Sequence, residues 1–260
     1  MTDAAPMHAQ IQPRRHYKYY DLVMVAFVTV LLCSNLIGPG KSCAIDVGAR
    51  MIPDYKPEQG LFLSAMLVFG AGNIFFPISY IFGDVLTEVY GYARARKVIW
   101  AGFGAMIFAT VMSRVVLWLP ENAEEPYNKT IVPALEIVFG NTGRIVAGSL
   151  FAFWVGDFVN SYVLAKLKIV TGGKLLWTRT IGSTICGQFV DSILFYPIAF
   201  YGTWDNTTLV KISIFNWLFK VGVEVVLTPA TYAICNWLKR AEGVDHFDRE
   251  TNFTPFSLKD

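Results

Sequence analysis

Two carboxylates stand close together inside an apolar run of this chain. Asp84 and Glu88 lie four residues apart in the stretch FPISYIFGDVLTEVYGYARARK, residues 76–97. Side chains at i and i+4 share one face of a helix, so both carboxylates are predicted to point the same way. Two ionised carboxylates cannot pair with each other, and they therefore need a cation, a proton or a hydrogen-bond donor from a ligand. An ionisable residue inside a membrane span is by default a candidate functional site.

Further ionisable residues fall in other apolar runs, namely Asp157, Asp191, Lys220 and Glu224. Even low insertion scales assign about 2.5–3.5 kcal/mol to an Asp or Lys at the centre of a span. These side chains are therefore predicted to face one another or a wet cavity rather than lipid. Lys220 and Glu224 are again four residues apart, and a simple ion pair between them is the alternative to a functional role.

Uncharged polar side chains accompany the carboxylates. Gln188 and Asp191 are three residues apart and offer an amide and a carboxylate on one helix face. Asn160 follows Asp157 in the same apolar run, and Arg179 lies near the start of another. Tyr80 precedes Asp84 by four residues. Its ring suits a flat ligand, although packing inside a helical bundle is the more usual role of such an aromatic residue.

The composition is that of a membrane protein. Hydrophobic residues make up 54% of the 260 residues, charged residues only 16%, and the mean hydropathy is +0.43. A soluble domain is usually about a quarter charged. The length is sufficient for several spans of roughly 20 residues each. The sequence therefore predicts an all-α fold, a polytopic helical bundle in the membrane.

The apolar runs predict about six transmembrane helices, at residues 22–37, 61–90, 98–119, 144–167, 177–201 and 209–238. The second run is longer than a bilayer requires and contains glycines and Pro77, so a broken or partly re-entrant span is expected. Discontinuous helices of this kind often form transporter binding sites. Another apolar stretch, residues 131–140, is too short to cross.

The distribution of Lys and Arg predicts the orientation. Basic residues gather before the first span, between the second and third, between the fourth and fifth, and after the sixth. Cytoplasmic loops carry such an excess, so both termini are predicted to be cytoplasmic. The chain then divides into a disordered N-terminal segment at 1–19, a transmembrane domain at 20–239 and a cytoplasmic tail at 240–260.

The motifs of several enzyme classes are missing from the sequence. An intramembrane aspartyl protease would carry Gly-x-Gly-Asp, but Asp84 and Asp157 follow Ile-Phe-Gly and Trp-Val-Gly. No HExxH motif, phosphate-binding loop or nucleotide fingerprint is found. The three histidines lie in the predicted tails, and the four cysteines form no C-x-x-C pair. We therefore expect no catalytic residues, metal, cofactor or nucleic-acid partner.

Two stretches resemble a known family. FPISYIFGDVLTEVYGYARARKVIW, residues 76–100, resembles the signature of the queuosine precursor transporter family, a group of small six-span proteins of the bacterial inner membrane. RTIGSTICGQFVDSILFYPIAF, residues 179–200, is similar to the second hallmark of that family. The resemblance covers about residues 20–239. It implies import of 7-cyano-7-deazaguanine, 7-aminomethyl-7-deazaguanine or queuine, which are used for the queuosine modification of tRNA.

The implied substrate matches the chemistry of the candidate residues. A 7-deazaguanine presents a ring N–H and an amino group side by side, which suits a carboxylate such as Asp84, Glu88 or Asp191. Its carbonyl and ring edge need donors such as Gln188, Asn160 or Arg179. We expect the substrate path to be lined by Asp84, Glu88, Gln188 and Asp191, with support from Asp157, Asn160 and Lys220. Arg179, Glu224 and Tyr80 are further candidates for substrate binding. The sequence leaves the oligomeric state open.

Two other classes of function stay open at this point. A six-span chain of this size could be a substrate-capturing subunit for another vitamin or nucleobase, working with an ATP-driven partner. It could also be a membrane enzyme or assembly protein that transports nothing. The missing catalytic motifs argue against an enzyme, and the buried carboxylates argue against a pure scaffold.

Overall fold

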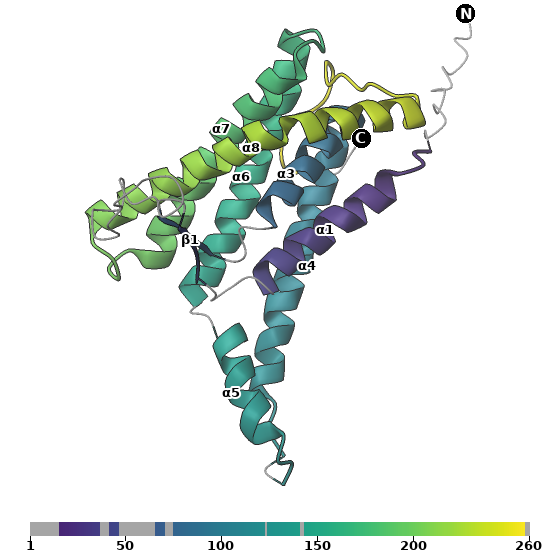
Figure 1. Cartoon of the computed structure of the whole chain (residues 1–260). Coiled ribbons are helices and arrows are strands. Elements are labelled where there is room, and N and C mark those ends of the chain that lie inside the picture. Colours follow the sequence, from purple (N-terminus) through teal and green to yellow (C-terminus); the bar gives the residue numbers. More distant parts are fainter. Residues whose placement is uncertain are drawn as a thin grey trace, which may run out of the picture.

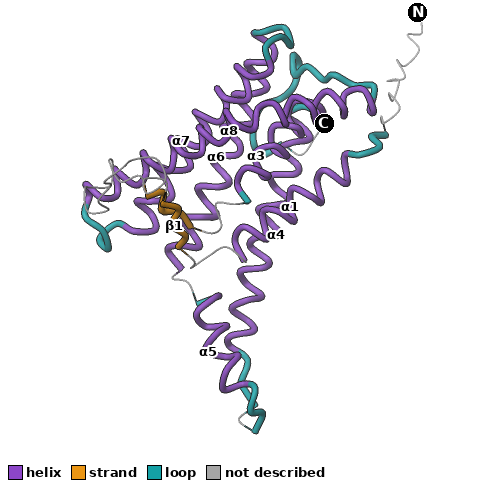
Figure 2. Tube along the Cα trace, viewed as in Figure 1, coloured by secondary structure: helices purple, strands orange, loops and turns teal. Residues whose placement is uncertain are grey.

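The computed structural model describes residues 16–36, 42–46, 66–70, 75–122, 124–140 and 143–257. Most of these residues are helical (Figures 1 and 2). The helices, in chain order, are α1 (Tyr20–Leu36), α3 (Phe76–Val85), the π-helix η2 (Leu86–Tyr90), α4 (Tyr92–Trp118), α5 (Asn128–Phe139), α6 (Gly143–Val170), α7 (Leu176–Phe200) and α8 (Asn206–Glu242). The predicted disordered segment at 1–19 falls mostly outside the described residues.

The long helices match the apolar runs. In the part of the chain that the structure describes, α4, α6 and α7 are each long and apolar enough to cross a membrane, and α1 is a shorter apolar helix. Five predicted spans start within a few residues of an observed helix, namely α1, α4, α6, α7 or α8. The largest difference is at α4, which begins before the first residue predicted for its span. The chain is therefore a helical, multi-pass membrane protein. The short stretch at 131–140 belongs to α5, which projects with the end of α4 (Figure 1).

A pair of strands departs from the predicted all-α fold. β1 (Ser42–Asp46) and β2 (Met66–Gly70) pair antiparallel, with Ser42 opposite Gly70 and Asp46 opposite Met66. The predicted second span, 61–90, is thus broken, and its helical part begins only at Phe76. Pro77 fits this start because a proline lacks the N–H that the first helical turn leaves unbonded. Residues 61–65 and 71–74 lie outside the described residues.

A π-helical turn and a glycine shape the junction between α3 and α4. The turn η2 continues α3 directly and ends at Gly91, whose φ of +87° is unfavourable for any other residue. Helix α4 begins at the next residue. The basic residues predicted between the second and third spans, Arg94, Arg96 and Lys97, therefore lie in the first turns of α4. Single π-helical turns of this kind occur frequently at functional sites.

The core of the bundle surrounds η2. Val89 and Tyr90 of η2 are fully buried together with Phe27 and Leu31 of α1. Helices α6 and α7 pack most closely, and α8 packs against α7 and α3. Close approach of α6 and α7 requires Gly187, since a Cβ there would lie 2.9 Å from the carbonyl oxygen of Gly156. Small residues at helix crossings are typical of membrane bundles.

The segment after α8 folds back onto the start of α4. The carboxylate of Asp248 accepts the Tyr92 N–H at 3.0 and 3.1 Å, and thereby caps this helix. The Arg96 guanidinium donates to the carbonyl oxygens of Asn252 and Thr254, both at 2.7 Å. The described part of the predicted tail, up to residue 257, is therefore packed against the bundle.

Candidate functional site

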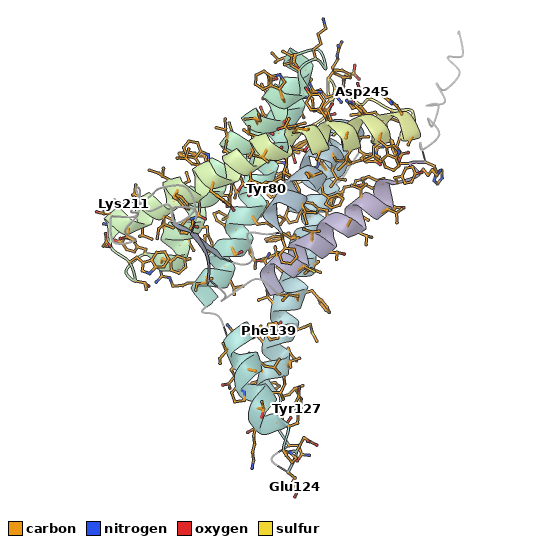
Figure 3. All side chains as sticks on the ribbon, in the orientation of Figure 1. Tyr80, Glu124, Tyr127, Phe139, Lys211 and Asp245 are labelled. Carbon is orange, nitrogen blue, oxygen red and sulfur yellow. The ribbon has the colours of Figure 1, made fainter. Side chains whose placement is uncertain are left out.

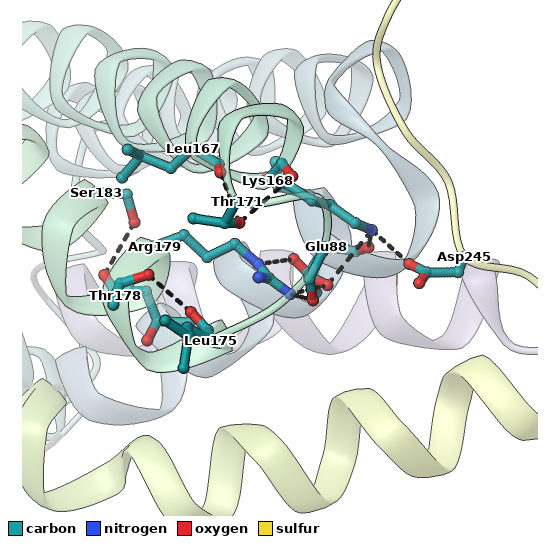
Figure 4. A network of polar contacts seen from close by, with 12 residues as sticks. Glu88, Leu167, Lys168, Thr171, Leu175, Thr178, Arg179, Ser183 and Asp245 are labelled. Carbon is teal, nitrogen blue, oxygen red and sulfur yellow. Dashed lines mark hydrogen bonds and ion pairs between the residues drawn. The ribbon is translucent and has the colours of Figure 1, made fainter.

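Glu88 is the centre of a buried charge network (Figure 4). The Arg179 guanidinium binds its carboxylate through both oxygens, with Nε to Oε2 at 2.7 Å and Nη2 to Oε1 at 2.8 Å. The ammonium groups of Lys239 and Lys168 also contact Oε1, the latter at 3.4 Å. Glu88, Arg179 and Lys168 are each at most 1% exposed. We call these four residues, together with Asp245, the Glu88 network.

Asp245 joins the network from the segment after α8. Its carboxylate lies 2.6 Å from the Lys168 Nζ and 2.9 Å from the Lys239 Nζ. Partial burial acts to raise the pKa of Asp245, but these two ammonium groups hold it below its usual value. Lys168 also donates to the backbone oxygen of Glu88 at 2.5 Å. The network thus ties α6, α7, α8 and the following segment to η2.

Asp84 has different partners from Glu88. Its Oδ1 accepts a hydrogen bond from the Asn160 side chain at 3.1 Å, and its Oδ2 has no hydrogen-bond partner among the described residues. Asp84 and Glu88 were predicted to share one helix face, but in the structure the two carboxylates have separate sets of partners.

Lys220 connects α8 to α7. Its ammonium group lies 2.6 Å from the Asp191 carboxylate and 3.0 Å from the Gln188 Oε1. The alternative that Lys220 only pairs with Glu224 is not what the structure shows. Both carboxylate oxygens of Glu224 are buried and have no hydrogen-bond partner in the described part of the chain.

A pocket lies between these groups. Its wall combines apolar and polar side chains from α1, α3, η2, α4, α6 and α7, and the polar side chains are Ser79, Tyr80, Asp157, Asn160, Ser161 and Gln188. Tyr80 contributes to this wall from α3. Mostly apolar pockets with a few convergent polar groups are the usual form of small-molecule sites.

The predicted site residues therefore divide into three groups. Tyr80, Asp157, Asn160 and Gln188 line the pocket. Asp84 and Lys220 each contact a pocket-lining residue, Asp191 contacts Lys220, and Glu224 lies on α8 one turn from Lys220. Glu88 and Arg179 belong to the Glu88 network instead. Sequence reasoning did not identify Lys168, Lys239 and Asp245 as parts of a site, because their charges were counted only as loop and tail residues.

The sequence also matches a known family. Residues 70–234, which contain the pocket residues of α3, α6 and α7, match the family model described as "Putative vitamin uptake transporter". This match covers more than half of the chain. The chain belongs to this transporter family.

Three named proteins are similar to this chain. A "Probable queuosine precursor transporter" of Bacillus subtilis is 35% identical over 62% of this chain and 69% of the relative. A protein of the same name from Haemophilus influenzae is 25% identical over 63% of this chain and 66% of the relative. The "Queuosine precursor transporter" of Escherichia coli is 23% identical over 63% of this chain and 71% of the relative. No solved structure matches the chain.

Proposed function

We propose that this chain is a membrane transporter that imports queuosine precursors, 7-deazaguanine bases such as 7-cyano-7-deazaguanine, 7-aminomethyl-7-deazaguanine or queuine. The observation that carries the proposal is the shared name of three relatives, each aligned over more than three fifths of this chain. The pocket supports it, since a flat polar base requires both an apolar wall and convergent hydrogen-bonding groups.

We further propose six membrane crossings in the bacterial inner membrane, made by α1, the α3–η2 unit, α4, α6, α7 and α8, with both termini cytoplasmic. Basic residues of four junctions gather at one end of the bundle, where Lys168 and Lys239 meet Glu88 and the Tyr20 hydroxyl donates to the Arg94 carbonyl oxygen at 3.1 Å. Figure 3 places the acidic Glu124 at the opposite tip from Asp245. The excess of Lys and Arg favours the first end as cytoplasmic.

The substrate contacts are assigned within this pocket. Asp157 lines the pocket, and its carboxylate has no hydrogen-bond partner among the described residues. It suits the adjacent N–H and amino group of the base. The amide groups of Asn160 and Gln188 suit the carbonyl and ring edge. A site built this way discriminates strongly against analogues that lack these groups, because its own buried polar atoms would then remain unpaired.

The other predicted residues have supporting roles in this assignment. Asp84 orients the Asn160 amide, while Lys220 orients Gln188 and is itself held by Asp191. Glu88 and Arg179 hold the helices together and do not reach the pocket wall. Tyr80 supplies an aromatic wall from α3.

The proposal can be tested by measuring the queuosine content of tRNA. A bacterial strain that neither makes the precursor nor has its own importer would express this chain and receive low external precursor. Queuosine is expected to reappear in tRNA, and Asp157→Asn is expected to lower initial uptake tenfold or more. A charge-assisted hydrogen bond contributes about 1.5–3 kcal/mol, and each 1.4 kcal/mol is about a factor of ten.

The matched control is Asp21→Asn, the same substitution at an exposed position of α1, which should leave uptake unchanged. Failure of all three precursors to restore queuosine, with membrane insertion verified, would overturn the proposal. Binding without transport would instead identify a substrate-capturing subunit that needs a partner.

A further inference from the structure

Glu224 is a buried carboxyl group without a hydrogen-bond partner. It lies in the middle of α8, its side chain is 0% exposed, and both carboxyl oxygens lack a hydrogen-bond partner in the described part of the chain. The nearby Thr228 hydroxyl donates to the Glu224 backbone oxygen, not to the side chain. Buried polar groups are nearly always hydrogen-bonded, so this exception requires an explanation.

A second buried carboxyl group lies on a helix that packs against α8. Helix α3 packs against α8, and Asp84 of α3 lies within electrostatic range of Glu224. Asp84 is also 0% exposed, and only its Oδ1 has a partner, the Asn160 amide. The other ionisable groups around this pair are Glu88, Asp157, Tyr80, Lys220 and Cys235. Of these, Glu88 is held by its network and Lys220 contacts Asp191.

Burial of this kind disfavours the ionised form. An ionised carboxylate without a compensating partner is unstable in an apolar interior, and the group binds a proton instead. Two carboxyl groups that share a site likewise retain a proton between them. We propose that Asp84 and Glu224 form a proton-binding site, and that the proton bound there enters the cell together with the substrate. This inference rests on the proposed function.

The contacts of the pair connect it to the pocket. Asn160 lines the pocket and donates to Asp84, so a substrate that engages the Asn160 amide acts directly on one partner of the pair. On the other side, Gln188 lines the pocket and accepts from Lys220, which lies one helical turn before Glu224. Substrate binding and proton binding are therefore linked through two pocket residues, Asn160 and Gln188. In each cycle one proton would bind with the base outside and leave with it inside.

The experiment uses the purified full chain in proteoliposomes with 7-cyano-7-deazaguanine, a neutral base. A neutral substrate gains nothing from the membrane potential itself, so its accumulation requires a coupling ion. With the potential clamped at zero, an inward pH gradient should drive accumulation at least tenfold above the level without a gradient. Addition of the base to the outside should also raise the external pH measurably, because protons enter with it.

Glu224→Gln removes the exchangeable proton but keeps the shape of the side chain. In this variant, accumulation of the base driven by the pH gradient should fall at least tenfold more than the exchange of labelled for unlabelled base. The reason is that exchange requires no net proton movement. The matched control is Glu136→Gln at an exposed position of α5, which should behave like the unaltered protein. Asp157→Asn, a change in the pocket wall itself, should lower accumulation and exchange together.

The outcomes separate the two proposals. Exchange without pH-driven accumulation in the unaltered protein would overturn the proton site and leave the transporter function standing. Accumulation driven by an imposed sodium gradient, and not by pH, would also overturn it. An equal loss of accumulation and exchange in Glu224→Gln would place Glu224 in substrate binding instead. Absence of both exchange and accumulation in correctly inserted protein would contradict the proposed function itself.

Discussion

Two fully buried glutamates of this protein have opposite surroundings. Glu88 meets three cationic side chains from α6, α7 and α8, and both its oxygens are occupied by Arg179. Glu224 is equally buried, but its oxygens have no hydrogen-bond partner among the described residues. A buried carboxylate with enough cations is an ion-pair centre that holds helices together. A buried carboxyl group without them is available for an exchangeable ligand, here a proton.

The two glutamates should also respond differently to substitution. Removal of one member of a saturated network leaves a buried charge without compensation, which weakens the fold. Neutralisation of an unpartnered carboxyl group removes little that the fold depends on, and its effect should appear in transport. The predictions below test this contrast through the free energy of unfolding, measured by denaturant titration in detergent.

The largest effect is expected for Arg179→Ala. It removes the guanidinium that binds both oxygens of Glu88, and loss of one partner of a buried ion pair costs about 3–5 kcal/mol. The control is Lys211→Ala, which removes an exposed cation from α8 and should change the free energy of unfolding by less than about 0.5 kcal/mol. If Arg179→Ala costs no more than the control, the two lysines suffice and the guanidinium is dispensable.

Gly91→Ala should have the next largest effect. The backbone at Gly91 has a positive φ, and a Cβ there would collide with the His246 ring. Strain of this kind costs about 1–3 kcal/mol. Gly104→Ala is the matched control, because Gly104 is helical and no atom lies within 4 Å of its added Cβ. Equal stabilities of the two variants would show that the turn presenting Glu88 to its cations does not depend on this glycine.

Asp248→Asn should lower the free energy of unfolding by about 1 kcal/mol near neutral pH, since Asp248 caps α4. Burial acts to raise the pKa of Asp248, but the His246 side chain, the Tyr92 N–H and the Thr251 hydroxyl hold it below its usual value. A lowered pKa in the folded state means that this contribution is present above about pH 4 and is lost as pH falls further.

Denaturant titrations at several pH values check the direction of this pH dependence. The unaltered protein should lose stability between about pH 5 and pH 3 more steeply than Asp248→Asn. Glu250→Gln, a neighbouring exposed carboxylate, serves as the control and should follow the unaltered protein. Parallel pH profiles for all three proteins would mean that Asp248 contributes no charge-dependent stability.

The smallest effect on stability is expected for Glu224→Gln, less than about 0.5 kcal/mol. The substitution exchanges a neutral acid for a neutral amide of the same shape. Glu88→Gln provides the matched comparison, because it leaves Arg179 without a carboxylate and leaves Lys168 and Lys239 with only Asp245, and it should cost roughly 3 kcal/mol. If both glutamine variants lose the same stability, the contrast between the two glutamates does not exist.

The positions of the helices could be predicted from the sequence because each follows from a local cause. The apolar runs became α1, α4, α6, α7 and α8. Pro77, which predicted a break in the second span, lies at the start of α3, and the side chain of Asp205 caps the start of α8. The strand pair β1–β2 was not predicted, since the pairing of residues 42–46 with 66–70 depends on contacts distant in sequence.

Several residues chosen from the sequence lie close together in the structure, but their arrangement was not predicted. Asp157, Asn160 and Gln188 were selected as polar residues in apolar runs, and the structure places all three on one pocket wall. The separate partners of Asp84 and Glu88 were not predicted, because the residues that they contact lie on other helices, distant in sequence. The partners of Glu88 lie up to 151 residues away, so no local signal could identify them.

The packing of the segment after α8 has a consequence for the order of assembly during synthesis. The cap of α4 comes from Asp248, 156 residues after Tyr92, and Arg96 relies on carbonyl oxygens of the same late segment. While the ribosome is still producing α6, α7 and α8, the first turn of α4 lacks these partners. Biogenesis of this end of the bundle is therefore completed last, and a tag inserted between α8 and Asp248 would interfere with maturation more than one placed in the α4–α5 connection.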